Sequence, residues 1–146
     1  MTTTKSTSIV QAYLNFDGRC DEALEFYKRA IGADVTLLMR YKDNPEPPQP
    51  GACGPAPGSE NKVMHASFRV GVTELMASDG HCGGKPDFKG IRLSLTVATD
   101  AEAEKSFAAL ADGGVVEMPL AKTFFSSRFG MVADKFGIGW MILVRQ

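Results

Sequence analysis

The chain repeats one pattern twice, and this repeat limits its possible folds more than any other feature. A strand-like run at residues 9–16 leads into an acidic, alanine-rich amphipathic stretch, a glycine and a further strand-like run. The same order returns from residue 91, with Phe107 in the place of Tyr27. Because the copies lie more than half the chain apart, there is room for two modules but not for a solenoid. The groove between the modules is therefore the first place to look for function.

Length and composition fit a globular protein with an ordinary core. The chain has 146 residues, of which 44% are hydrophobic and 23% charged. A net charge of −1 with scattered Lys and Arg argues against nucleic acid or a membrane as a partner. The three cysteines form no C-x-x-C pair, and the N-terminal residues lack the apolar run of a signal peptide. We therefore expect a cytoplasmic protein.

Two amphipathic helices are predicted, one in each module. The first opens with Asp21 and Glu22 at the positive end of its dipole, and Gly32 ends it. The second opens with Thr99-x-x-Glu102, the spacing of a capping box. The stripes expected to face the core are Ala23, Phe26, Tyr27, Ala30 and Ile31 in the first helix and Ala103, Phe107, Leu110 and Ala111 in the second.

A proline- and glycine-rich loop interrupts the first module. Residues 44–59 hold six of the eight prolines, and neither a helix nor a strand ladder can run through so many missing N–H donors. The second module has no equivalent segment. A tolerated surface insertion and a lid over a pocket are both compatible with the loop.

A hairpin with the two-residue turn Gly71-Val72 follows this loop. The turn pairs Val70 with Thr73 and Ser67 with Met76, which places alternate residues on opposite faces. The face suited to packing on a helix carries Met64, Ala66, Phe68, Val70, Leu75 and Ala77. The half-polar face, which needs water or a ligand, carries His65, Ser67, Arg69, Glu74, Met76 and Ser78.

Several segments resemble the PhnB-like branch of the glyoxalase/bleomycin-resistance/dioxygenase group, the vicinal oxygen chelate superfamily. They are YLNFDGRCDEALEFYKRAIGADV, KVMHASFRVG with TELMASDG, and RFGMVADKFGIGWMI, and the likeness spans residues 13–143. The resemblance implies an α+β fold of two βαβββ modules whose curved mixed sheets enclose a shared cavity, and a homodimer. We expect modules at residues 8–80, with the loop at 44–60, and at 90–146, which together form one structural domain.

The metal site of glyoxalase-like members is not carried over onto this sequence. The resemblance places the ligand positions at Ala12 or Gln11, at Leu75 or Glu74, at Arg92 and at Met141. A cation and a thioether do not suit a hard, oxygen-chelating ion, and one carboxylate is not a site. We therefore expect no cofactor and no metal ligands, with a divalent metal as the alternative.

Nine residues are predicted to line the ligand site. His65 lies among serines and can serve as a base or a hydrogen-bonding group, with a structural histidine as the alternative. Arg92 can hold a carboxylate or reach water at a sheet edge, and Phe125 can stack a flat ligand or pack in the core. The predicted ligand-binding residues are His65, Ser67, Met76, Ser78, Arg92, Ser94, Phe125, Arg128 and Met141.

No motif in the sequence identifies a reaction. The sequence favours a protein that binds a small organic molecule without a tightly held metal, and whether it is an enzyme stays open. One alternative is a metal-dependent lyase, isomerase or dioxygenase of the glyoxalase type, in which Glu74 and His65 join further ligands. Others are an antibiotic-sequestering resistance protein and a structural dimer whose pocket is filled by side chains.

Overall fold

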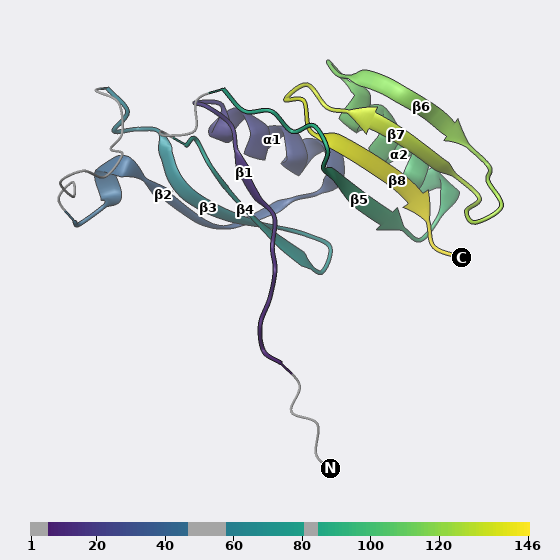
Figure 1. The fold of residues 1–146 in the computed structure, drawn as a ribbon, viewed down its shortest axis with the longest axis horizontal. Helices are drawn as coiled ribbons and strands as arrows, with labels where there is room; N and C mark the ends of the chain where they lie inside the picture. The colour runs from purple at the N-terminus through teal and green to yellow at the C-terminus, as the bar shows by residue number, and fades with distance from the viewer. Residues whose placement is uncertain (1–5, 47–57, 81–84) are drawn as a thin grey trace, which may run out of the picture.

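The computed structural model describes residues 6–46, 58–80 and 85–146, and the pattern βαβββ occurs in it twice (Figure 1). The first copy contains β1 (Tyr13–Asn15), α1 (Cys20–Ile31), β2 (Asp34–Arg40), the 3-10 helix η1 (Tyr41–Asp43), β3 (Val63–Val70) and β4 (Thr73–Ser78). The second contains β5 (Arg92–Val97), α2 (Asp100–Ala111), β6 (Val115–Ala121), β7 (Phe129–Ala133) and β8 (Gly139–Val144).

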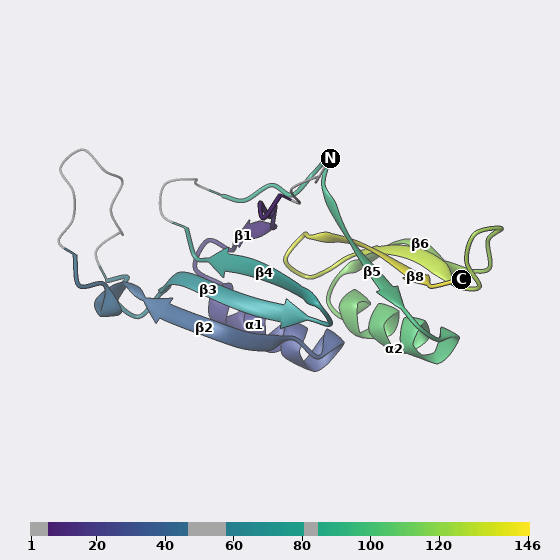
Figure 2. The ribbon, with the colours of Figure 1, turned by 90° about the horizontal axis from the view of Figure 1, so that it is seen from below.

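The two copies form two four-stranded mixed sheets with the same strand order. Sheet A has the order β1-β4-β3-β2 and sheet B the order β5-β8-β7-β6. In each sheet the first strand runs parallel to the last, and the other pairs are antiparallel. The sheets are separate rather than one closed sheet, and both helices lie on the same side of them (Figure 2). The predicted α+β fold of two βαβββ modules is confirmed.

Both helices begin and end much as the sequence predicts. α1 ends where Gly32 adopts φ 69° and donates its N–H to the Tyr27 carbonyl. At the start of α2 the Thr99 hydroxyl accepts the Glu102 N–H at 3.2 Å. The Glu102 carboxylate, however, accepts the N–H of Ala98 rather than that of Thr99. The threonine half of the capping box is present, whereas the glutamate bonds the N–H of the residue before the predicted one.

The core of the molecule is centred on Tyr27 of α1. Its ring stacks on Phe68 of β3 with centroids 6.0 Å apart, and meets the edge of Trp140 of β8 at 5.7 Å. Its hydroxyl donates to the buried carboxylate of Asp134 at 2.6 Å, and this carboxylate also accepts the Trp140 indole N–H at 2.9 Å. A residue of the first module is therefore fastened to the second module inside the core.

Burial raises the pKa of Tyr27, and the Asp134 carboxylate raises it further. The raised pKa keeps the hydroxyl protonated at neutral pH, so it can donate to Asp134.

One prediction about local structure changes. The first strand covers only Tyr13–Asn15, and Ile9 and Val10, which the sequence places in it, are 75% and 99% exposed. The hairpin is confirmed, since Val70 pairs with Thr73 and Ser67 with Met76.

The centre of the loop, residues 47–57, lies outside the described residues, so its role as a lid stays a prediction. Of the helices that the structure describes, none is long and apolar enough to span a membrane.

Candidate functional site

Each sheet has one face packed under a helix and one face that no helix covers, which we call the open face. In the β3–β4 hairpin, Ala66, Phe68, Leu75 and Ala77 are buried in the core. Their neighbours along each strand alternate onto the open face of sheet A. The predicted residues His65, Ser67, Met76 and Ser78 therefore share this face.

Three residues of the open face of sheet A form what we call the His65 cluster: Tyr13, His65 and Ser67. The Tyr13 hydroxyl lies 2.9 Å from Nδ1 of His65, and the Ser67 hydroxyl lies 3.5 Å from Nε2. Tyr13 and Ser67 each pair with Met76, so the tyrosine reaches across β4 to the histidine on β3. Both nitrogens of this partly exposed imidazole face a hydroxyl, so a ligand that hydrogen-bonds to the histidine would replace one of them, most readily Ser67 at the longer distance.

Ser78 lies near this cluster but uses its hydroxyl within the chain. It donates to the Asn15 side-chain carbonyl at 2.8 Å and accepts the Gly80 N–H at 3.1 Å. The residue is 5% exposed. Asn15 and Ser78 therefore fix the end of β1 against β4, and the role of Ser78 in binding stays a prediction.

Arg92 lies on the open face of sheet B, and its guanidinium group is already hydrogen-bonded to a carboxylate of the same chain. The guanidinium donates to both Glu117 oxygens, at 2.6 and 3.1 Å. The hydrogen bond with Arg92 lowers the pKa of Glu117, and the same bond raises the pKa of Arg92. The arginine crosses the paired Gly139, where an added Cβ would come 3.0 Å from Nη1. A ligand carboxylate that binds Arg92, as predicted, would therefore have to compete with the Glu117 carboxylate.

Thioethers fill the middle of the open face of sheet B. Ser94 pairs with Met141, Met141 with Met131, and Met131 with Met118, so one row crosses all four strands. Residues opposite one another on adjacent strands share a face. The predicted residues Ser94 and Met141 therefore lie together, on a face that is more apolar than that of sheet A.

The structure separates Phe125 and Arg128 from the other predicted residues. The Phe125 ring packs on Phe129 with centroids 5.0 Å apart. The guanidinium of Arg128 reaches Asp100 and Glu104 of α2, at 3.7 and 3.4 Å. Arg128 is therefore engaged by the helix side of the module, and neither residue joins the His65 cluster.

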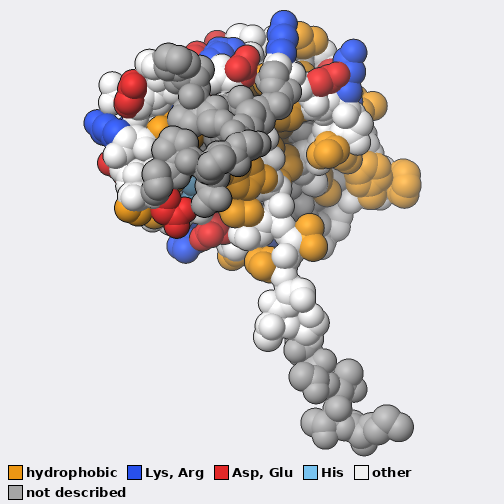
Figure 3. Space-filling view, turned by 60° about the vertical axis from the view of Figure 1, so that its left-hand side comes forward, with side chains coloured by type: hydrophobic (Ala, Val, Ile, Leu, Met, Phe, Trp, Pro, Cys, Tyr) orange, Lys and Arg blue, Asp and Glu red, His pale blue; other side chains and the backbone are white. Residues whose placement is uncertain are grey.

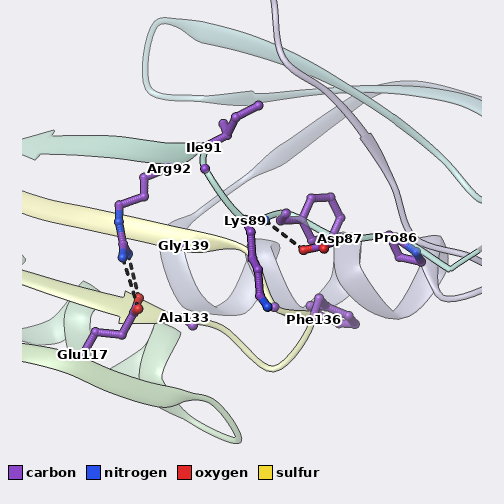
Figure 4. A pocket seen from close by; sticks show the side chains of 12 residues that line it. Pro86, Asp87, Lys89, Ile91, Arg92, Glu117, Ala133, Phe136 and Gly139 are labelled. Carbon is purple, nitrogen blue, oxygen red and sulfur yellow. Dashed lines mark hydrogen bonds and ion pairs between the residues drawn. The ribbon is translucent and has the colours of Figure 1, made fainter.

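A separate pocket of about 760 Å³ lies beside the start of β5 (Figure 4). Arg92 is the one predicted site residue that lines it. The rest of its lining comes from the segment between the modules and from sheet B: Pro86, Asp87, Phe88, Lys89, Gly90, Ile91, Glu117, Ala133, Phe136, Gly137 and Gly139. The sequence offered a signal for it, because apolar Phe88 and Ile91 stand in a connecting segment where polar residues are usual.

The described residues do not fit a hard divalent metal. Of the expected ligand positions, Arg92 is paired with Glu117, Met141 offers a thioether, and Glu74 pairs in register with Arg69. Across residues 6–46, 58–80 and 85–146, no three His, Cys, Asp or Glu side chains converge in a way that could hold an ion. We therefore derive no chemical step through a metal.

Residues 8–143 match the model of a family described as 3-demethylubiquinone-9 3-methyltransferase. The chain belongs to this family, which is the PhnB-like branch of the glyoxalase/bleomycin resistance/dioxygenase superfamily. Protein YjdN of Escherichia coli is 33% identical over 135 residues, which are 90% of this chain and 92% of that protein. The resemblance stated from the sequence is thereby confirmed.

Solved structures of PhnB-like and related proteins share the fold. Protein PA1353 from Pseudomonas aeruginosa superposes with a TM-score of 0.81 and 39% identity. The match includes 96% of this chain and 99% of PA1353. A PhnB protein from Bacillus cereus superposes with a TM-score of 0.76 and 29% identity, over 94% of this chain and 99% of that protein. A glyoxylase/bleomycin resistance protein/dioxygenase domain from Frankia, at 14% identity, shows the fold alone, with a TM-score of 0.64. These relatives identify no specific reaction.

Proposed function

We propose that the chain binds a small organic molecule on the open face of sheet A and needs no tightly held metal to do so. The observation that carries this proposal is the His65 cluster, in which β1 and β3 bring Tyr13, His65 and Ser67 together on a face that no helix covers. A sheet face that only packs against other parts of the protein would be apolar, and it would not carry a partly exposed imidazole held between two hydroxyl groups.

The neighbours of the cluster indicate what kind of molecule it accepts. Met76 lies between Tyr13 and Ser67 in the register, and Met39 pairs with His65. Thioether side chains adapt their shape to apolar surfaces, whereas imidazole and phenol groups form directed hydrogen bonds. The ligand is therefore a molecule with an apolar body and at least one hydroxyl, carbonyl or carboxylate group.

Methyl transfer, which the family description names, has little support in the described residues. A protein that binds S-adenosylmethionine typically offers a glycine-rich turn between a strand and a helix. Here β1 leads to α1 through Phe16-Asp17-Gly18-Arg19, and β5 leads to α2 through Ala98-Thr99. The antibiotic-sequestering alternative stays a prediction, since no described contact favours one ligand of that class.

We further propose that the chain acts as a homodimer. The outer edge strands of both sheets, β2 and β6, carry exposed apolar side chains. They are Val35, Leu37, Leu38, Val115, Val116 and Met118, each between 38% and 64% exposed. Figure 3 shows that apolar side chains reach the surface on one face of the molecule. A second copy covering these edges would bury both the apolar surface and the unpaired backbone groups.

The cytoplasm is the compartment that this proposal favours. Cys20, the cysteine that the structure describes, is a buried free thiol, and burial raises its pKa, which keeps it unreactive. An unpaired thiol of this kind fits a reducing compartment.

The test combines metal analysis with ligand screening. Protein purified without added ions should carry far less than one divalent ion per chain. In a thermal-shift screen of organic acids, phenols and amino acids, a compound at 100-fold over its Kd stabilises the fold by about 2.7 kcal/mol. Compounds that bind at the His65 cluster should lose most of this effect with His65→Gln and Tyr13→Phe, and keep it with Glu25→Gln on the exposed side of α1.

Two outcomes would contradict the proposal. One is a stoichiometric divalent ion that is lost with Glu74→Ala, which would favour the metal-dependent alternative. The other is that no stabilising compound loses its effect in the His65→Gln variant.

A further inference from the structure

The pocket beside β5 lies away from the His65 cluster. With about 760 Å³, it is within the range of roughly 300–1,000 Å³ that is typical of small-molecule sites. None of the His65 cluster residues lines it. A ligand in this pocket would therefore not need the residues of the His65 cluster.

The walls of this pocket are aromatic and rigidly placed. Phe88 and Phe136 line it together, and each packs on the buried Phe16, with ring centroids 6.3 and 5.6 Å away. The Asp134 carboxylate accepts the backbone N–H of Phe136 at 2.9 Å, which fixes the turn that carries this ring. The Arg19 guanidinium already lies over one face of Phe136, 4.6 Å from the ring centroid. The half-buried ring surface that remains, together with Phe88, favours a flat, apolar ligand body.

Lys89 supplies a positive charge to this pocket. Its side chain extends along the pocket towards Ala133 and Phe136 (Figure 4). Within the described parts of the chain, its ammonium takes part in no ion pair. By contrast, the guanidinium of Arg92 at the other end of the pocket is neutralised by Glu117 at 2.6 Å. An ammonium group beside aromatic walls attracts an anionic group on a flat molecule.

The carboxylates of the pocket limit how much negative charge the ligand can carry. Asp87 and Glu117 both line the pocket. The Asp87 carboxylate accepts the backbone N–H of Lys89 at 3.1 Å, and the Glu117 carboxylate is paired with Arg92. A second negative charge on a ligand would be repelled by these groups. A single charge placed at Lys89 avoids most of this repulsion.

We propose that this pocket binds a planar aromatic monocarboxylate, with its carboxylate at the Lys89 ammonium and its ring against Phe88 and Phe136. The proposal does not rest on the function assigned to the His65 cluster.

Benzoate is the probe for this site, and the full chain is titrated with it by amide NMR. We expect shifts concentrated in residues 86–91 and 136–139, and weaker binding of benzamide, which lacks the charge, and of phthalate, which carries two. Because a hydrogen bond to a charged group is at stake, Lys89→Gln should raise the benzoate Kd about tenfold or more. Lys105→Gln, which removes an exposed lysine from α2, should leave the Kd unchanged.

The outcomes separate this proposal from the previous one. His65→Gln should not alter benzoate binding, so loss of binding in that variant would overturn the pocket site. It would also be overturned if benzamide bound as tightly as benzoate, if Lys89→Gln had no effect, or if millimolar benzoate caused no shifts. None of these results bears on whether another compound binds at the His65 cluster.

Discussion

The two modules have the same strand order and helices of equal length, yet they contribute very differently to the core. Both helices contain 12 residues, but α1 buries six of them and α2 only two, Ala103 and Leu110. At matching positions, Tyr27 stacks on the large ring of Phe68, whereas Phe107 lies over Gly130, where an added Cβ would approach it to 2.8 Å. The duplicated topology is thus stabilised mainly from the first module.

The open faces differ as much as the packed ones. Sheet A presents imidazole, phenol and hydroxyl groups, whereas sheet B presents a row of thioethers and an internal ion pair. A fold that repeats its backbone need not repeat its chemistry, because function depends on side chains that the fold leaves free to vary. The first module is therefore both the structural anchor and the better candidate for directed recognition.

The largest expected effect compares the two ring positions. Phe68→Ala removes a fully buried ring from the stack on Tyr27 and should cost about 3–5 kcal/mol of unfolding free energy. Phe107→Ala removes a half-buried ring and should cost roughly half as much. Urea denaturation of both variants measures the difference. Equal losses would show that the core is shared evenly between the modules.

A smaller effect compares how the two helices are capped. α1 has no side-chain cap at Arg19, but the buried Asp79 carboxylate accepts the N–H groups of Cys20 and Val63 at 2.8 and 2.6 Å. Asp79→Ala leaves both donors unpaired and should cost about 2–3 kcal/mol. Thr99→Ala removes an exposed cap from α2 and should cost about 1 kcal/mol. If the threonine variant were the less stable one in thermal denaturation, the proposed asymmetry would be wrong.

The smallest expected effect is the pH-dependent stabilisation by one surface ion pair in each module, and it should be similar in the two. Hydrogen bonds with Arg40 and Arg92 lower the pKa of Asp21 below 3.8 and that of Glu117 below 4.5. Because each pKa is lower in the folded chain, the stabilisation is present above the unfolded pKa and is lost as the pH falls through the folded value.

Asp21→Asn and Glu117→Gln should therefore each destabilise the chain at neutral pH by less than Thr99→Ala does. The difference from the unaltered chain should vanish in acid, and added salt should reduce it. Stability curves measured at neutral and acidic pH check this. A deficit that persisted after both carboxylates were protonated would point to a role other than ion pairing.

Local periodicity predicted the helices and the β3–β4 hairpin, whereas the arrangement of two βαβββ modules was what the family resemblance implied. The stripe of α1 is buried as expected at Ala23, Phe26, Tyr27 and Ala30, and the hairpin turn fixed the register of β3 and β4. The first strand proved shorter because Ile9 and Val10 have no neighbouring strand in the described chain, and strand propensity alone does not show whether a partner is present.

The site was harder to predict because its contacts cross strands that are far apart in sequence. Alternation along the hairpin correctly placed His65 and Ser67 on one face, but not the Tyr13 hydroxyl, which depends on β1 pairing beside β4. Likewise, the Glu117 partner of Arg92 lies on β6, at the opposite edge of sheet B. Such pairs follow from strand order, which periodicity does not specify.

Methionine-methyl NMR tests the central claim most directly, because the chain has seven methionines and both open faces carry some of them. Spectra would be recorded against each compound that stabilises the protein in the thermal-shift screen. Ligand binding at the His65 cluster should shift the methyl signals of Met39 and Met76, and His65→Gln should abolish those shifts. If the shifts were confined to Met118, Met131 and Met141 for every stabilising compound, no ligand would bind at the His65 cluster, and the assignment would be contradicted.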